Sequence, residues 1–201
     1  MKELITKAAD ELFVKYGLRS VTMDDIAKKL AISKKTIYQF FEDKDALVET
    51  IVQQKLVEQT TAMNEIFNQS SNPIDEVLRL SDYIKESMSK LHPSILYDME
   101  KFFPKSYAMF QNHKQCCFKD SFIINLKRGI ELGLYRSNIN TDILAVMRLS
   151  QIEMGFNPHL FPPDKHKLQD IQVEFIMHFL YGISTIKGHK LINKYHQITE
   201  E

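Results

Sequence analysis

Apolar residues recur every three or four positions over most of the chain, which is the period of one face of an α-helix. Alternation of apolar and polar residues, the pattern of a strand, is not found over any useful length. The first helical stripe ends before Gly17, a residue that can adopt positive φ and end a helix. Its members are Leu4, Ile5, Ala8, Ala9, Leu12, Phe13 and Tyr16. The pattern predicts an all-α fold of about nine helices.

Two short helical patterns follow the first helix and meet at a tight turn. Thr22 can accept a hydrogen bond from a backbone N–H, and Asp25 stands three positions later, which is a variant of the capping box. A turn at Ala31 separates this helix from a second one over 34–40, which Ser33 caps. If φ at Ala31 is positive, alanine there costs about 1 kcal/mol relative to glycine. The arrangement predicts a helix-turn-helix with 34–40 as the recognition helix.

The predicted recognition helix has two chemically different faces. Ile37, Phe40 and Phe41 repeat at helical spacing and are expected to face a core. The opposite face carries ammonium, hydroxyl and amide groups. Lysine neutralises phosphate, a tyrosine hydroxyl bonds a phosphate oxygen, and glutamine pairs with the edge of adenine in the major groove. The candidate DNA-binding residues are Thr22, Ser33, Lys34, Lys35, Thr36, Tyr38, Gln39 and Lys44.

These candidates differ in their expected roles. Gln39 and Thr36 are the better candidates for reading bases, because amide and methyl groups match features of base edges. Thr22 and Lys44 stand at helix starts, where free N–H groups and the helix dipole favour an anionic oxygen. A single lysine is ordinarily a solvated surface charge. Four lysines and no acidic residue between positions 26 and 41 favour contact with DNA instead.

The rest of the chain predicts longer helices. They cover a long helix that Asp43 caps, a helix from Pro73 to Leu91, a short one ending at Pro104, and helices over 105–132, 141–156 and 168–191. The last two are apolar on more than one side, so each needs a second partner. Either they are central core helices, or they form a symmetric dimer; we expect a homodimer through the helices near 141–156 and 168–191.

Composition narrows the function classes. The 201 residues carry no formal net charge, so any affinity for DNA must come from a local patch. We expect no membrane span, because no long uncharged apolar run is present. The start of the chain lacks the pattern of a secretory signal, and the adjacent Cys116 and Cys117 form no disulfide framework. A reducing, cytoplasmic location is therefore expected.

Enzymatic and metal-binding functions find little support in the residues. No Gly-rich phosphate loop, nucleophile elbow or HExxH pattern is present, so we expect no enzyme. The seven histidines are scattered without the spacing of metal ligands, and we expect no metal or cofactor. The pair Cys116 and Cys117 could form a redox sensor, but two ordinary small residues are the favoured interpretation.

A series of residues between positions 4 and 51 has the order and spacing of a known family. The series is Phe13, Gly17, Thr22, Ile26, Ala27, Ile32, Ser33, Thr36, Tyr38, Phe40, Phe41, Lys44 and Leu47. In these positions the chain resembles the TetR family of bacterial one-component transcriptional regulators. The stretch 128–136 followed by Asn140 looks like the family's junction before its dimer helices. Ala31 stands where the family often has glycine.

The resemblance implies an all-helical homodimer with a helix-turn-helix DNA-binding domain over 1–46 and a ligand-binding and dimerisation domain over 47–201. The function implied is a repressor, released from a palindromic operator by a small apolar or amphipathic effector. Methionine and aromatic side chains make adaptable pockets, although they also fill ordinary cores. The candidate pocket residues are Tyr83, Met88, Tyr97, Met99, Phe103, Phe110, Cys117 and Met147. The alternative is an architectural or partner-regulated DNA-binding protein without an effector.

The predicted division between base reading and phosphate binding can be tested by mutation. We expect Gln39→Ala to weaken binding to the preferred site more than to random DNA, because only base contacts carry sequence information. Lys44→Ala should weaken both, since phosphate contacts are independent of sequence. Competition binding on specific and scrambled duplexes measures this difference. Equal losses on the two duplexes for both variants would contradict the division.

Overall fold

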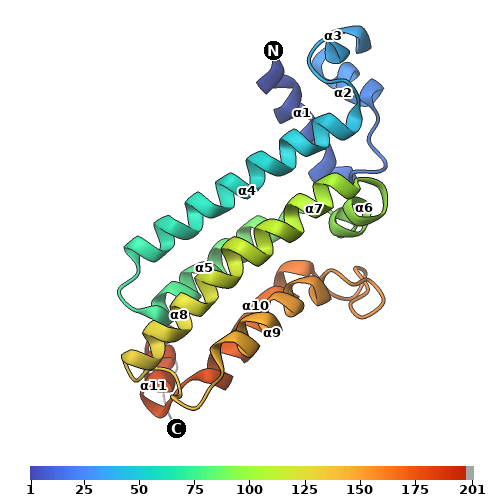
Figure 1. Cartoon of the computed structure of the whole chain (residues 1–201). Helices are drawn as coiled ribbons and strands as arrows, with labels where there is room; N and C mark the ends of the chain where they lie inside the picture. Colours follow the sequence, from blue (N-terminus) through green and yellow to red (C-terminus); the bar gives the residue numbers. More distant parts are fainter. Residues whose placement is uncertain (198–201) are drawn as a thin grey trace. The chain divides into compact units, whose positions relative to one another are not determined.

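The computed structural model describes residues 1–197, and within that range it contains helices and no strand (Figure 1). The predicted all-α fold is confirmed. The elements are α1 (Lys2–Tyr16), α2 (Met23–Leu30), α3 (Lys34–Tyr38), α4 (Lys44–Gln69), α5 (Pro73–Ser89), α6 (Ile95–Phe102), α7 (Pro104–His113), the π-helical turn η1 (Lys114–Phe118), α8 (Lys119–Glu131), α9 (Thr141–Gly155), α10 (Leu168–Ile183) and α11 (Ile186–Tyr195). None of these helices is long and apolar enough to cross a membrane.

Residues 1–59 and 90–113 form one compact unit. In this unit α1 packs on α2, α2 packs on α3, and α6 packs on α7. The side chains with no exposed surface lie in the first four helices and are Ile5, Ala9, Ile26, Ile37, Leu47 and Val48. The predicted boundary between residues 46 and 47 stays a prediction, and the compact unit adds α6 and α7 to the helix-turn-helix.

The helix ends in this unit follow from local chemistry, as predicted. Gly17 ends α1 with φ +83°, and Thr22 and Asp25 form both hydrogen bonds of the capping box of α2. Ser33 caps α3 by accepting a hydrogen bond from the Thr36 N–H at 3.1 Å. Ala31 has φ +52°, the left-handed conformation that favours glycine.

Three details differ from the predicted pattern. The recognition helix is shorter than 34–40, because α3 ends at Tyr38 and the N–H groups of Phe40 and Phe41 both bond to the Ile37 carbonyl. This turn carries Phe41 into the core and leaves Phe40 40% exposed, so the predicted core position of Phe40 is wrong. Leu4, near the start of the first stripe, is also exposed, as is Tyr16 at its end.

The second compact unit consists of residues 60–89 and the described residues from 114 onward. Its most extensive packing is between α5 and α10, and α8 packs on both α5 and α9. The buried apolar cluster is Ile74, Leu126, Leu134, Tyr135, Phe179, Leu180, Ile183 and Ile192. The Tyr135 hydroxyl lies inside this cluster and is 3.1 Å from the Asn125 Oδ1, to which it donates. The largest buried aromatic ring therefore has a partner for its polar end.

Two predicted helices are interrupted. The helix expected over 105–132 is divided by η1. The helix expected over 168–191 ends at Ile183, and α11 begins after Thr185, whose hydroxyl accepts a hydrogen bond from the Gly188 N–H. The Thr185 N–H donates to the Leu134 carbonyl at 2.9 Å, and the Arg136 N–H donates to the Ile183 carbonyl at 2.9 Å. These backbone hydrogen bonds to residues about 50 positions away therefore interrupt the helix that the apolar pattern of 168–191 predicts.

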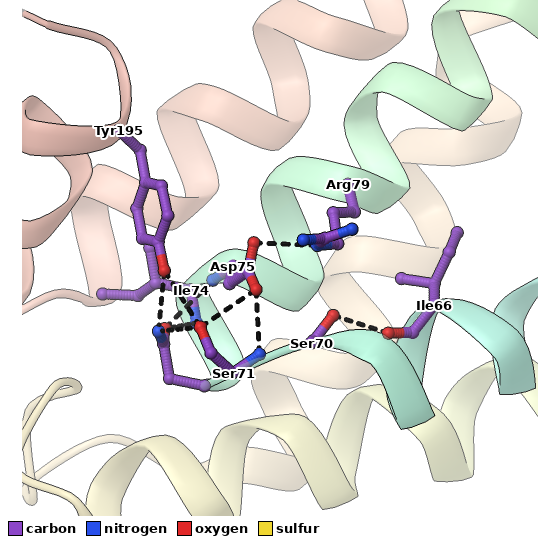
Figure 2. A network of polar contacts seen from close by, with 8 residues as sticks. Ile66, Ser70, Ser71, Ile74, Asp75, Arg79 and Tyr195 are labelled. Atoms are coloured by element: carbon purple, nitrogen blue, oxygen red, sulfur yellow. Dashed lines mark hydrogen bonds and ion pairs between the residues drawn. The ribbon is translucent and has the colours of Figure 1, made fainter.

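A polar network holds the connection between α4 and α5 (Figure 2). The N–H and hydroxyl of Ser71 donate to Asp75 at 2.8 and 3.0 Å, and the Arg79 Nε donates to the same carboxylate at 2.9 Å. Burial raises the pKa of Asp75, but these hydrogen bonds outweigh it and hold the pKa below its usual value. The Tyr195 hydroxyl of α11 lies 3.1 Å from the Ser71 hydroxyl, so the end of the described chain is tied to this connection.

Gly129 provides a test of the packing in the second unit. A Cβ at this position of α8 would lie 1.9 Å from the Tyr135 Cδ2, and the Tyr135 ring is buried and hydrogen-bonded. We expect Gly129→Ala to lower the free energy of unfolding by about 1–3 kcal/mol, the usual effect of overpacking a core. The measurement is chemical denaturation at fixed protein concentration.

The matched control is Gly182→Ala in α10, where a Cβ would meet no atom within 4 Å. Alanine there should leave the free energy of unfolding unchanged or raise it by up to about 1 kcal/mol, since glycine is a poor residue inside a helix. Equal effects of the two substitutions would show that the Tyr135 ring does not restrict Gly129.

Candidate nucleic-acid interface

α3 presents a polar surface on an apolar anchor. Ile37 has no exposed surface, whereas Lys34, Lys35 and Tyr38 are exposed on the same helix. Gln39 follows α3 in helical backbone conformation and is exposed as well. The structure thus brings six of the predicted DNA-binding residues, those from Ser33 to Gln39 other than Ile37, together at one place. Their contact with DNA stays a prediction.

The two lysines of α3 have different surroundings. The Lys34 ammonium donates to the Asp24 carboxylate at 2.9 Å, and both side chains are about half exposed. This hydrogen bond raises the pKa of Lys34. Exposed ion pairs contribute little to stability, so Lys34 can exchange Asp24 for a phosphate at small cost. Lys35 forms no ion pair within residues 1–197, which leaves its ammonium available to a polyanion.

The hydroxyl groups of the interface already have partners within the protein. The Thr22 hydroxyl donates to the Asp25 carboxylate at 2.6 Å, and hydrogen bonds from Thr22 lower the pKa of Asp25. The Ser33 and Thr36 hydroxyls lie 2.8 Å apart and bond to each other. These bonds hold the starts of α2 and α3, so each of these hydroxyls has a structural role beside the predicted contact with DNA.

Lys44 is placed differently from the expectation. Its ammonium is half-buried and donates to the carbonyls of Leu18 and Arg19, in the loop between α1 and α2. It also lies 5.7 Å from the centroid of the Phe13 ring and 5.3 Å from that of Phe103. Burial lowers the pKa of Lys44, although nearby carboxylates oppose this effect. The ammonium therefore holds the α1–α2 loop, and its predicted contact with phosphate stays untested.

A contact between α6 and the same loop was not predicted from the sequence. Asp98 of α6 is buried, and its Oδ2 accepts hydrogen bonds from the Arg19 N–H at 3.1 Å and the Ser94 hydroxyl at 3.0 Å. A Cβ on Gly17 would lie 3.1 Å from this carboxylate oxygen, so glycine allows the close approach. The Arg19 guanidinium lies 4.7 Å from the Phe102 ring centroid. The signal in the sequence is Gly17, which ends α1 and also leaves room for the Asp98 carboxylate.

The predicted pocket residues are divided between the two compact units. Tyr97, Met99, Phe103 and Phe110 belong to the first unit, and Tyr83, Met88, Cys117 and Met147 belong to the second. Met99 and Phe103 are buried, whereas Tyr97 and Met147 are exposed. Buried side chains that fill a core and exposed ones that face solvent do not by themselves form a pocket, so this set stays a prediction. Within the described chain, no cluster of three or more potential metal ligands is present.

Comparisons with known proteins agree with this geometry. Residues 5–51 match the sequence profile described as bacterial regulatory proteins, tetR family. The chain is 27% identical over 167 residues to YvaF, an HTH-type transcriptional regulator of Bacillus subtilis, and the match covers 81% of this chain and 85% of YvaF.

Two solved structures share the fold. A TetR-family transcriptional regulator from Agrobacterium tumefaciens has a TM-score of 0.75 at 17% identity, covering 92% of this chain and 97% of that one. Thermus thermophilus FadR, a TetR-family transcriptional repressor in complex with lauroyl-CoA, has a TM-score of 0.60 at 18% identity, covering 92% of this chain and 96% of FadR. With its exposed α3 surface and the match over residues 5–51, this chain belongs to the tetR family and is a DNA-binding transcriptional regulator.

Proposed function

We propose that this chain is a cytoplasmic homodimeric repressor, which leaves a near-palindromic operator when a small apolar or amphipathic effector binds. The observation that carries the proposal is the exposed polar surface of α3 on the buried anchor Ile37. A helix with this surface fits the major groove. FadR of T. thermophilus, which has the same fold, was solved with an acyl-coenzyme A. That ligand is a precedent for an amphipathic effector.

The proposed dimer interface rests on an uncovered apolar face of α9. Ile143, Val146, Met147 and Met154 are exposed, Ile143 by 65%, and their spacing places them on one side of the helix. A contiguous exposed apolar surface marks an interaction site. A second copy that presents the same face would cover it with two-fold symmetry. Two recognition helices related by that symmetry would then read two half-sites of a dyad, about one helical turn or a multiple apart.

The other predicted dimer helix has a different pattern. In α10 the apolar residues Leu168, Ile171, Ile176 and Leu180 are buried within the chain itself. The wide apolar arc of this segment is therefore largely core, which was one of the two interpretations of the sequence. The contribution of α10 to the dimer stays a prediction, whereas α9 has an apolar face that the described part of the chain leaves exposed.

The proposed release from DNA uses the contact between α6 and the α1–α2 loop. An effector shifts the equilibrium only if it binds better to the conformation in which the recognition helices are misplaced. Asp98 of α6 and Lys44 of α4 both bond to residues of this loop. A displacement of either helix therefore changes the support of α2 and α3. Each 1.4 kcal/mol of coupling changes operator affinity by about tenfold, and DNA must weaken effector binding equally.

The dimer and its operator can be tested together. We expect Val146→Glu to raise the dimer dissociation constant by more than about tenfold, because a carboxylate would be buried without a counter-charge. Selection from random duplexes should recover a dyad with the unmodified protein, and Val146→Glu should protect that site only at higher concentration. Analytical ultracentrifugation and footprinting measure the two effects.

The matched control is Ile124→Glu, which places the same charge at an exposed isoleucine of α8. This variant should remain a dimer and bind the selected site normally. A footprint without a dyad, or equal dissociation of the two variants, would overturn the proposed assembly.

The contact between α6 and the α1–α2 loop is tested by Asp98→Ala. This change leaves the Arg19 N–H without its acceptor, and we expect a loss of about 1–3 kcal/mol in the free energy of unfolding, together with weaker operator binding. Asp98→Asn keeps a carbonyl acceptor and should lose less. Thermal unfolding and operator titration measure both quantities.

Asp82→Ala, at an exposed aspartate of α5, is the control and should change the free energy of unfolding by less than about 0.5 kcal/mol. If Asp98→Ala binds the operator as tightly as this control, α6 does not support the DNA-binding helices.

A further inference from the structure

Arg148 of α9 is a buried cation that has no carboxylate partner among residues 1–197. Only 3% of its surface is exposed. A guanidinium has five N–H donors, yet within residues 1–197 its one hydrogen bond is a long one, 3.4 Å from Nη1 to the Gln151 Oε1. The guanidinium also lies 6.0 Å from the centroid of the Phe122 ring of α8. Most of its donors are therefore not used by the part of the chain that the structure describes.

The charge on Arg148 persists at neutral pH. Burial lowers the pKa of the guanidinium to about 10, which is still well above 7. Buried charges in proteins are ordinarily paired, because removing an ion from water is unfavourable unless an opposite charge or several hydrogen bonds replace the water. A buried arginine with so few hydrogen bonds can therefore take a bound anion as its counter-charge.

A second buried cation also contacts α9. Lys114 of η1 is 4% exposed and forms an ion pair with Glu153 of α9. This pair shows that the region stabilises a buried cation when the chain supplies an acid. No such acid pairs with Arg148 in the part of the chain that the structure describes. The contacts of α9 with η1 and α8 thus contain two buried cations and one paired carboxylate.

We propose that Arg148 binds the anionic group of the effector, a carboxylate or a phosphate, in the helices of the second compact unit. The planar guanidinium can donate two parallel hydrogen bonds to either group, and the Phe122 ring borders it on another side. This proposal rests on the proposed effector response and narrows it: the effector is an amphipathic anion, and its apolar part contacts side chains such as Phe122.

Binding at Arg148 also suits a regulatory site. The guanidinium is enclosed, so an anion reaches it only when α9 and α8 separate locally. α8 continues through η1 into α7, which belongs to the compact unit of the DNA-binding helices. An anion would thus bind more tightly to the conformation in which α8 and α9 are separated, and this difference in affinity is what an effector needs. A shift of α8 would act on a helix whose continuation, α7, belongs to the other unit.

The test uses three probes with the same ten-carbon chain: decanoate and decyl phosphate below their critical micelle concentrations, and 1-decanol below its solubility limit. Isothermal titration calorimetry on the full-length protein measures their affinities. We expect at least one of the anions to bind at least about tenfold more tightly than the alcohol, equivalent to about 1.4 kcal/mol. The preferred anion identifies the head group as a carboxylate or a phosphate. Equal affinity for all three probes, or no binding of either anion, would overturn the proposal.

Arg148→Met assigns this preference to the residue. The variant should bind decanol with unchanged affinity and lose the preference for the anion, whereas the control Arg136→Met, at an exposed arginine, should keep it. Because the substitution removes an incompletely paired buried charge, the unliganded variant should unfold at the same or a higher temperature. A lower unfolding temperature together with loss of decanol binding would show a purely structural arginine and overturn the proposal.

Arg148→Lys is a second test of the same residue, and it does not require the Arg148→Met variant to fold. Lysine keeps the positive charge but cannot donate two parallel hydrogen bonds to one head group. The preference for the anion should therefore fall at least about tenfold. Retention of the full preference would overturn the assignment of Arg148.

Operator titration with the same probes separates this proposal from the proposed function. If the anion binds through Arg148 and operator affinity does not change, the anion site stands and the effector response fails. If decanol and the anions release the operator equally, the effector response stands and the assignment of Arg148 fails.

Discussion

The burial of Ile37 is the constraint on which the DNA-facing surface depends. α3 has five residues, and a helix of that length is not stable by itself in water. Ile37 has no exposed surface, Phe41 is buried shortly after the helix, and the Ser33 hydroxyl accepts a hydrogen bond from the Thr36 N–H in the first turn. These contacts hold the backbone, so the outward side chains are free to be chosen for recognition. A regulator can therefore vary its operator without changing its fold.

Three interior cations show how the remaining structure manages charge. The Lys44 ammonium has two backbone carbonyls and two aromatic rings around it. Lys114 has the carboxylate of Glu153. Within residues 1–197, Arg148 has one long hydrogen bond and one neighbouring aromatic ring. The first two are stabilised by the chain itself, and they hold a loop and a helix contact in place. The third is incompletely stabilised, and the difference between the three is the basis for assigning it to a ligand.

Much of the fold was visible in local patterns. The apolar period of three to four residues predicted the helices, and the capping residues Thr22, Ser33 and Asp43 marked where three of them begin. Gly17 and Gly133 have positive φ where helix ends were expected. Each of these features depends on residues within about one turn of helix, so the sequence contains the necessary information directly. For the same reason, the exposed polar face of α3 was predictable.

The sequence by itself determined that the chain is helical, where most helices begin, and which residues face outward on α3. Only the tertiary structure decided that Phe40 is exposed, that Thr185 starts a new helix, and that Lys44 points into the α1–α2 loop. It also decided that Asp98 accepts a hydrogen bond from the Arg19 N–H and that, among the described residues, no acid pairs with Arg148. Most of these features depend on contacts between residues that are tens of positions apart, which no local pattern of apolar and polar residues specifies.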